Sequence, residues 1–231
     1  MKIAVILAGG LGKRLMPLTK NTPKSLVKIN KRPFLGYIMD NLSQAGITKF
    51  LIVYKNNKEK FRRFLKKYKF KAKLIHQPIP LGTGHAVSLV KNLIGNNPFF
   101  VIAGDQLFSV RDLSNFINSN SAATIGAYPV KDSRNYGLIF TNARGFLKRI
   151  IEKPSKKISG YVNISLYKSN MKIFRYLSKI QISERKEYEL TDAFSMMAKK
   201  EKITIYKLKD YWIDLGHIKD IPVIERKLKN L

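Results

Sequence analysis

Continuous apolar runs alternate with amphipathic segments through the first hundred residues, and this alternation is the strongest constraint on the fold. The apolar runs occupy residues 2–7, 50–54, 73–76 and 99–103. Between them, apolar side chains recur at helical spacing in residues 33–45, 57–69 and 83–93. Strands joined by helices in this order form a parallel sheet that is covered on both faces. We therefore predict an α/β fold with three layers.

The second half of the chain changes to strand-like runs separated by turns. These runs are residues 122–130, 137–141, 146–152 and 160–167. We expect them to complete a mixed, mostly parallel sheet and to form a small β flap over its carboxyl edge. The remaining predicted elements are helices near 170–178, 189–200 and 220–229 and a strand at 203–208. Because no repeat or low-complexity linker interrupts the chain, residues 1–231 are predicted to form one domain.

The composition excludes several classes of protein. With 231 residues, 45% of them hydrophobic and 26% charged, the chain can bury a sizeable core. It has no run of 18 apolar residues, so a helical membrane span is excluded. The absence of cysteine excludes disulfides, thiolate metal sites and a cysteine nucleophile. The first residues are better explained as a strand than as a signal peptide, so a cytoplasmic location is expected.

The charge balance is unusual, with 44 Lys and Arg against 15 Asp and Glu and a net charge of +29. An excess of this size is typical of proteins that bind nucleic acid or other polyanions. Here the lysines are spread along the whole chain, which favours solvated surfaces. The basic face of the helix predicted at 57–69 could contact phosphates. A nucleic-acid-binding protein is therefore the alternative from a different functional class.

A glycine-rich segment, Leu-Ala-Gly-Gly-Leu-Gly-Lys-Arg-Leu-Met-Pro-Leu-Thr, spans residues 7–19 and is followed by Pro23-Lys24. Glycines directly after a strand let backbone N–H groups approach an anion closely. Arg14 and Lys24 add a guanidinium fork and a point charge for the same oxygens. The spacing excludes a P-loop, because Leu7 and Arg14 stand where glycine and Ser or Thr are required. It also excludes the dinucleotide-binding fingerprint, because Leu15 stands at the third glycine position.

Two carboxylates follow predicted strands. Asp105 comes directly after the apolar run 99–103, and Asp214 lies between Trp212 and Gly216. Because α/β sheets bind ligands at the carboxyl ends of their strands, we expect Asp105 to face the crevice; a helix N-cap is the structural alternative. Carboxylates combined with phosphate oxygens favour Mg²⁺. The three histidines lack metal-ligand spacing, which argues against zinc.

Together these motifs resemble the signature of the sugar-1-phosphate nucleotidylyltransferases. The pattern Gly-x-Gly-x-Arg-x-x-Pro-x-Thr begins at Gly10 and is followed by Pro-Lys. Further motifs recur in the order of that family: Gln77, residues 81–86, residues 100–105, Tyr136-Gly137, Glu152-Lys153-Pro154, Val162-Asn163 and residues 212–216. One position departs from the pattern, because Ser165 stands where the family usually has glycine, adding a side chain near the sugar pocket.

The resemblance implies a Rossmann-like nucleotide-diphospho-sugar transferase fold and a specific set of site residues. The implied catalytic residues are Arg14, Lys24, Asp105 and Lys153. The implied nucleotide-binding residues are Leu7, Ala8, Gly9, Gly10, Gly12, Lys13, Arg14, Gln77, Gly82 and Thr83. The implied sugar-phosphate-binding residues are Gly137, Glu152, Lys153 and Asn163, and the implied Mg²⁺ ligands are Asp105 and Asp214.

The expected reaction joins a nucleoside triphosphate, UTP or dTTP, to a sugar 1-phosphate, with glucose 1-phosphate as the default, and releases pyrophosphate. Neither a membrane nor a nucleic-acid partner is expected, and a homo-oligomer stays open. Enzyme alternatives are a mannose- or heptose-1-phosphate guanylyltransferase and a phosphocholine-type cytidylyltransferase; Glu152 and Asn163 argue against the latter. Because the chain ends soon after residue 216, we expect a monofunctional catalytic domain without a C-terminal β-helix.

Overall fold

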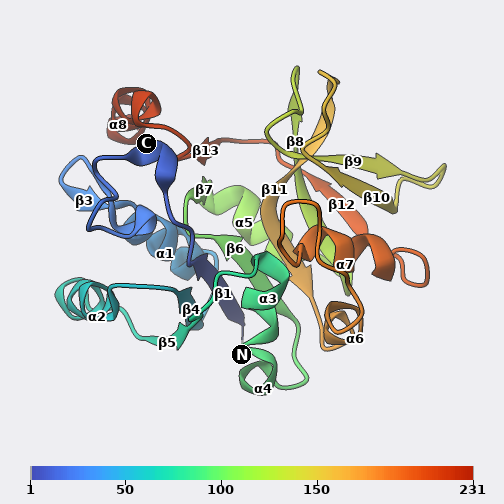
Figure 1. Cartoon of the computed structure of the whole chain (residues 1–231), viewed down its shortest axis with the longest axis horizontal. Helices are drawn as coiled ribbons and strands as arrows, with labels where there is room; N and C mark the ends of the chain where they lie inside the picture. The colour runs from blue at the N-terminus through green and yellow to red at the C-terminus, as the bar shows by residue number, and fades with distance from the viewer. Residues whose placement is uncertain (1, 231) are drawn as a thin grey trace.

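The computed structural model describes residues 2–230, which fold around a nine-stranded mixed sheet (Figure 1). Along the sheet the strands run β10-β9-β11-β6-β1-β4-β5, and β8 joins at β11 and carries β12. Their bounds are β1 Ile3–Ala8, β4 Lys49–Tyr54, β5 Ala72–His76, β6 Phe99–Ala103, β8 Thr124–Val130, β9 Gly137–Thr141, β10 Leu147–Glu152, β11 Gly160–Ser169 and β12 Thr204–Lys207. The predicted α/β class with a mixed sheet is confirmed.

The strands β6, β1, β4 and β5 form the parallel part of the sheet, and their carboxyl ends meet at one edge. Leu7 of β1 pairs in register with Val53 of β4 and with Ala103 of β6. The loops that follow these strands therefore lie next to one another. Beyond β6 the long strand β11 runs antiparallel, and the hairpin of β9 and β10 lies at the end of the strand order.

Helices cover both faces of the sheet. Successive residues of the central strands point to opposite sides, and because both sets are apolar, both faces must be buried. Ala4 and Ile6 enter one hydrophobic core, whereas Ile3 and Val5 enter the other. The first core is covered by α1 (Phe34–Gln44), α2 (Lys58–Lys67) and α5 (Val110–Ile117), and α8 (Ile221–Lys229) adds Ile224 to it. The second is covered by α3 (Thr83–Ser88), α4 (Lys91–Ile94), α6 (Ile173–Leu177) and α7 (Leu190–Met197). The three predicted layers are thus present.

Helix α2 shows how the basic composition is accommodated. Phe61, Phe64 and Leu65 are buried against the sheet, and Arg62 and Arg63 stay exposed. The amphipathic spacing predicted for residues 57–69 is therefore confirmed, with the charges on the solvent side. None of the helices within residues 2–230 has the length and apolar character required to cross a bilayer.

The structure corrects one predicted helix and adds another that was not predicted. The single helix expected at residues 83–93 is two helices, α3 and α4, because Val90 N–H bonds back three residues to Val87 and tightens the chain there. Helix α5 was not anticipated, although Ser109 caps it by accepting from the Asp112 N–H at 3.1 Å. Short strands also pair where none were expected: β2 Lys28–Ile29 with β3 Arg32–Pro33, and β7 Gln106–Phe108 with β13 Trp212–Asp214.

Candidate active site

The glycine loop leaves β1 at the edge where the parallel strands end. Gly12 has φ +63°, and a Cβ there would lie 2.8 Å from Thr19 Cγ2, so the turn requires glycine. Thr19 Oγ1 donates to the Gly12 carbonyl at 2.8 Å and fixes the return of the loop. A 3₁₀ turn at Lys13–Leu15 follows and buries Leu15, which leaves Lys13 and Arg14 exposed at the cavity. The loop thus presents backbone and two cations to one space.

Gln77 closes the opposite end of this space. Its side chain is only 4% exposed, and its amide nitrogen donates to the Gly82 carbonyl at 3.2 Å and lies 3.1 Å from His85 Nδ1. Gly9 packs directly on it, since a Cβ there would lie 2.8 Å from Gln77 Oε1. The nitrogen is therefore engaged within the protein, and the oxygen beside Gly9 is the atom available to accept from a bound base.

Asp105 lies in the turn after β6, as predicted from its place behind an apolar strand, and does not cap a helix. Lys24 Nζ forms an ion pair with Asp105 Oδ2. The β7–β13 pairing brings Asp214 opposite Gln106, whose amide nitrogen donates to Asp214 Oδ1 at 2.9 Å and to Asp105 Oδ1 at 3.3 Å. Both carboxylates therefore lie around one amide group, although 109 residues separate them in the sequence.

This carboxylate pair fits a divalent cation. Burial, and then repulsion from Asp105, raise the pKa of Asp214 to about 6. The negative charge of the pair is therefore only partly balanced by nearby positive charge. Lys24 supplies one such charge from the protein itself. Within residues 2–230 no group of three or more His, Cys, Asp or Glu side chains could hold a metal. A cation held here would therefore need oxygens from substrate and water, as Mg²⁺ commonly does.

Two residues that sequence reasoning missed, Arg185 and Glu187, line the third side of the cavity. Arg185 pairs with Glu189 at 2.9 Å, with Glu152 at 3.5 Å and with Glu187 at 3.7 Å. Their segment is tied to the loop before α3 and to the first turn of α3. The Tyr188 N–H donates to the Leu81 carbonyl, and the Tyr188 carbonyl accepts from the Gly84 N–H, both at 2.8 Å. No spacing signal marks this segment in the sequence, which reads as a polar connection between helices.

Thr83 and Gly82 hold that segment in place. Thr83 Oγ1 accepts from the Leu190 N–H at 3.0 Å. Gly82 has φ +102°, and a Cβ there would lie 2.7 Å from the Tyr188 carbonyl oxygen. Both residues were predicted to bind nucleotide, and in this structure they attach the Arg185 segment to the rim of the cavity.

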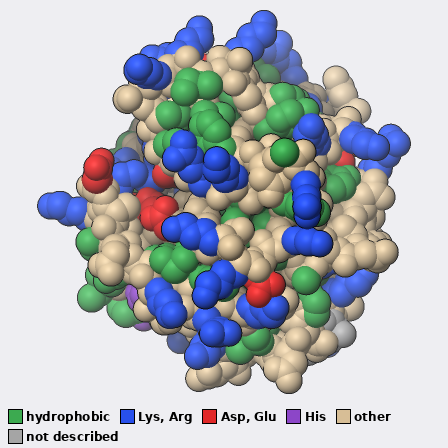
Figure 2. Space-filling view, turned by 90° about the vertical axis from the view of Figure 1, so that its right-hand side faces the viewer, with side chains coloured by type: hydrophobic (Ala, Val, Ile, Leu, Met, Phe, Trp, Pro, Cys, Tyr) green, Lys and Arg blue, Asp and Glu red, His purple; other side chains and the backbone are tan. Residues whose placement is uncertain are grey.

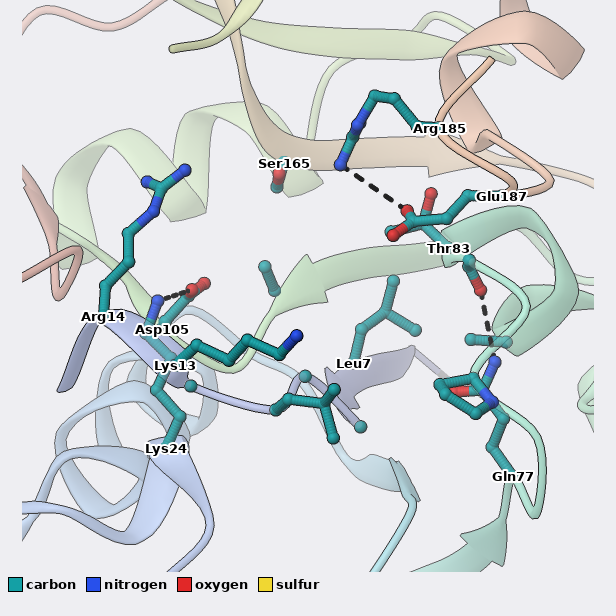
Figure 3. Close-up of a pocket in the computed structure, with 18 of the residues that line it drawn as sticks. Leu7, Lys13, Arg14, Lys24, Gln77, Thr83, Asp105, Ser165, Arg185 and Glu187 are labelled. Atoms are coloured by element: carbon teal, nitrogen blue, oxygen red, sulfur yellow. Dashed lines mark hydrogen bonds and ion pairs between the residues drawn. The ribbon is translucent and has the colours of Figure 1, made fainter. Parts of the chain in front are cut away.

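Two non-glycine residues lining the cavity, Lys153 and Ser165, have left-handed backbone conformations. Their φ angles are +45° and +57°. Such conformations cost on the order of 1–3 kcal/mol each and concentrate at functional sites. Ser165 is the position where the sequence departs from the family pattern, and its side chain enters the cavity from β11 (Figure 3).

The cavity, of about 610 Å³, gathers most of the expected site residues (Figure 3). Those lining it are Leu7, Gly9, Gly10, Gly12, Lys13, Arg14, Lys24, Gln77, Gly82, Thr83, Asp105 and Lys153. Five expected residues are absent from the lining: Ala8, Gly137, Glu152, Asn163 and Asp214. Of these, Asn163 is 7% exposed and forms hydrogen bonds with Tyr167 and Ser165. Glu152 forms an ion pair with Arg185, which lines the cavity.

Glu189→Gln is expected to raise the melting temperature at pH 8 by about 4 °C or more and to change it little at pH 5. Burial raises the pKa of Glu189 from 4.5 to about 7. Between these two values the folded protein binds more protons than the unfolded chain, so the free energy of unfolding falls as pH rises through this window. The neutral amide removes this cost. Thermal unfolding of both proteins at pH 5 and pH 8 measures the effect.

The matched control for this prediction is Glu184→Gln, which removes an exposed carboxylate from the same segment. It is expected to change the melting temperature equally little at both pH values. A Glu189→Gln gain that is the same at pH 5 and pH 8 would contradict the assignment of the cost to a buried charge.

Comparison with known proteins gives concordant matches. The nucleotidyl transferase family model matches residues 3–230. A bifunctional sugar-1-phosphate nucleotidylyltransferase/acetyltransferase from Sulfurisphaera tokodaii is 38% identical over 216 residues, covering 92% of this chain and 52% of that protein. The chain spans about half the length of the curated relatives it matches.

Solved structures match the whole fold. A UDP-glucose pyrophosphorylase in complex with UDP-glucose superposes with a TM-score of 0.88 and 25% identity, covering 100% of this chain and 99% of that one. A Bacillus anthracis protein assigned as a glucose-1-phosphate thymidylyltransferase gives a TM-score of 0.87 and 26% identity, covering 100% of this chain and 96% of that one.

Proposed function

Since the chain belongs to the sugar-1-phosphate nucleotidyltransferase family, we propose that it joins UTP or dTTP to glucose 1-phosphate, giving a nucleoside-diphosphate sugar and pyrophosphate. The observation that carries this proposal is one cavity whose three sides carry different chemical groups. A glycine loop with cations, a buried amide beside glycines, and a Lys153–Arg185 side line it together with Asp105. These sides suit a triphosphate, a base and a sugar phosphate in turn.

In the proposed mechanism, an oxygen of the sugar phosphate attacks the α-phosphorus of the triphosphate, and the bond to pyrophosphate breaks. The attacking oxygen is already anionic, so the protein contributes positioning and charge stabilisation rather than a nucleophile or base. We assign Arg14 and Lys13 to the leaving phosphates, Lys24 to the α-phosphate, and Lys153 with Arg185 to the sugar phosphate. Mg²⁺, which Asp105 and Asp214 would hold, supplies further positive charge when bound.

The choice of substrates rests on the two ends of the cavity. The Gln77 oxygen can accept from the ring N–H of uracil or thymine, and Gly9, which packs against that oxygen, lines the cavity beside it. For the sugar, the proposed contacts are Gly137, Glu152 and Asn163. Asn163 Oδ1 accepts from the N–H of Ser165, which lines the cavity. The structural neighbours, a UDP-glucose pyrophosphorylase and a glucose-1-phosphate thymidylyltransferase, support the same pair of substrates.

We also propose that residues 1–231 work as one catalytic domain in a cytoplasmic protein. The basic surface is proposed to be solvated rather than to bind nucleic acid. On the face that Figure 2 shows, which is the side of the molecule away from helix α2, Lys and Arg side chains are interspersed with hydrophobic, polar and acidic ones. The spread of Lys and Arg along the whole chain, rather than in one block, supports this proposal.

The test is pyrophosphate release with Mg²⁺ in a matrix of substrates. ATP, GTP, CTP, UTP and dTTP are each combined with glucose, N-acetylglucosamine, mannose and galactose 1-phosphates and with phosphocholine. We expect release that requires both UTP or dTTP and glucose 1-phosphate and stops with EDTA. Release only with GTP and mannose 1-phosphate, or only with CTP and phosphocholine, would replace the proposed substrates. No release from any pair would overturn the proposal.

A further inference from the structure

We propose that Gln106 is a positioning residue that turns one oxygen of Asp105 and one of Asp214 toward the cavity, so that the two can bind a divalent cation together. This inference rests on the proposed function, because it concerns the metal that function uses. Gln106 does not line the cavity and is 8% exposed. It was not among the residues expected from the sequence to act in the site.

The side chain of Gln106 contacts both carboxylates with the same atom. Its amide nitrogen donates to Asp214 Oδ1 at 2.9 Å and to Asp105 Oδ1 at 3.3 Å. The backbone supports this placement, since Gln106 and Asp214 are partners in the β7–β13 ladder and Leu215 N–H donates to the Asp105 carbonyl at 2.9 Å. Two strands far apart in sequence thus hold the two acids around one amide.

The orientation of this amide is determined by Trp212. The indole Nε1–H of Trp212 donates to Gln106 Oε1, and an indole nitrogen can only donate. The amide oxygen must therefore face Trp212, and the two N–H groups must face the carboxylates. The Trp212 ring is itself packed against Tyr128 and Tyr136, with ring centroids 5.3 and 5.4 Å away. The donor direction of Gln106 is thus set by a packed aromatic cluster.

The consequence lies in the carboxylate oxygens that Gln106 leaves free. The Oδ1 atoms of both acids accept from Gln106, which does not line the cavity. Asp105 Oδ2 contacts the Lys24 ammonium, and Lys24 lines the cavity. Asp214 Oδ2 lies 3.6 Å from the position of a Cβ on Gly216, another lining residue. Asp105 Oδ2 therefore faces the cavity, and Asp214 Oδ2 lies next to a residue that lines it, so one free oxygen of each acid is near the space where a cation and phosphate would arrive.

The test measures Mn²⁺ binding directly, by titration with electron paramagnetic resonance, in the presence of a nonreactive UTP analogue. Gln106→Met keeps the length of the side chain and removes both polar atoms. It is expected to raise the Kd for Mn²⁺ at least about tenfold, as loss of outer ligand contacts commonly does. Raising Mg²⁺ is expected to restore its turnover. The control Gln44→Met, at an exposed site at the end of α1, is expected to bind Mn²⁺ as the wild type does.

A double-mutant cycle separates positioning from general packing. Trp212→Phe keeps an aromatic ring in the cluster but removes the N–H that orients the amide, so it is expected to weaken Mn²⁺ binding several-fold. In Gln106→Met the same Trp212→Phe change is expected to have no further effect, because the group that it orients is gone. Additive losses would indicate two independent packing effects and would overturn the proposal.

Three further results would overturn it. The first is a folded Gln106→Met protein that binds Mn²⁺ within twofold of the wild type. The second, decisive if Gln106→Met does not fold, is a Trp212→Phe protein with unchanged Mn²⁺ affinity. The third is a wild-type protein that binds no Mn²⁺ at all. None of these measurements requires turnover, so a negative substrate matrix would reject the proposed function while leaving the metal-binding comparison interpretable.

Discussion

Asp105→Asn is expected to lower turnover at least about a hundredfold while leaving the fold intact. Removing a charged group that acts mainly in the transition state costs on the order of 3 kcal/mol. Asn has the same shape, and its oxygen can still accept from Lys24 or Gln106, both of which contact Asp105. The loss should therefore appear in catalysis and Mg²⁺ dependence rather than in stability. Steady-state pyrophosphate release across a range of Mg²⁺ concentrations, with thermal unfolding alongside, measures both.

The control for this substitution is Asp132→Asn. Asp132 forms an ion pair with Arg134 and is not among the residues lining the cavity. It should leave turnover unchanged. If Asp105→Asn kept turnover within tenfold of the wild type at every Mg²⁺ concentration, Asp105 could not hold the catalytic cation.

Arg14→Ala is the second substitution with a large expected effect, a loss of at least about a hundredfold in kcat. Arg14 is exposed beside the glycine loop and lines the cavity, and among residues 2–230 no carboxylate forms an ion pair with it. Its guanidinium is thus available for the phosphates that leave as pyrophosphate. Since these gain charge as the bond breaks, the loss should appear in kcat more than in KM.

Arg14→Lys is expected to recover only part of the lost rate, because an ammonium cannot bind two phosphate oxygens as a fork. Lys20→Ala removes an exposed cation just beyond the same loop, at a position outside the cavity lining, and is expected to be silent. A KM increase with unchanged kcat in Arg14→Ala would show that Arg14 binds the ground state only. The assigned role in stabilising the leaving group would then be wrong.

The layers of the fold could be predicted from the sequence because burial imposes local periodicity. The runs ending at Leu7 and Ala103 are apolar on both faces. This pattern is expected only of a strand that is covered on both sides. The glycine loop and Asp105 could be placed for the same reason, since each follows directly after such a strand. Helix α5 was missed because its cap, Ser109, lies directly after a short strand that the pattern did not reveal.

Other parts of the site were decided only by tertiary structure. The pairing of Gln106 with Asp214, the ion pair of Lys24 with Asp105, and the approach of Arg185 to the cavity each join segments far apart in sequence. Local periodicity records whether a side chain is buried and says nothing about which distant segment covers it. The sequence therefore determined the layers, the glycine loop and the acid at the strand end. Long-range strand pairing and packing decided which side chains surround that acid and in which direction its oxygens point.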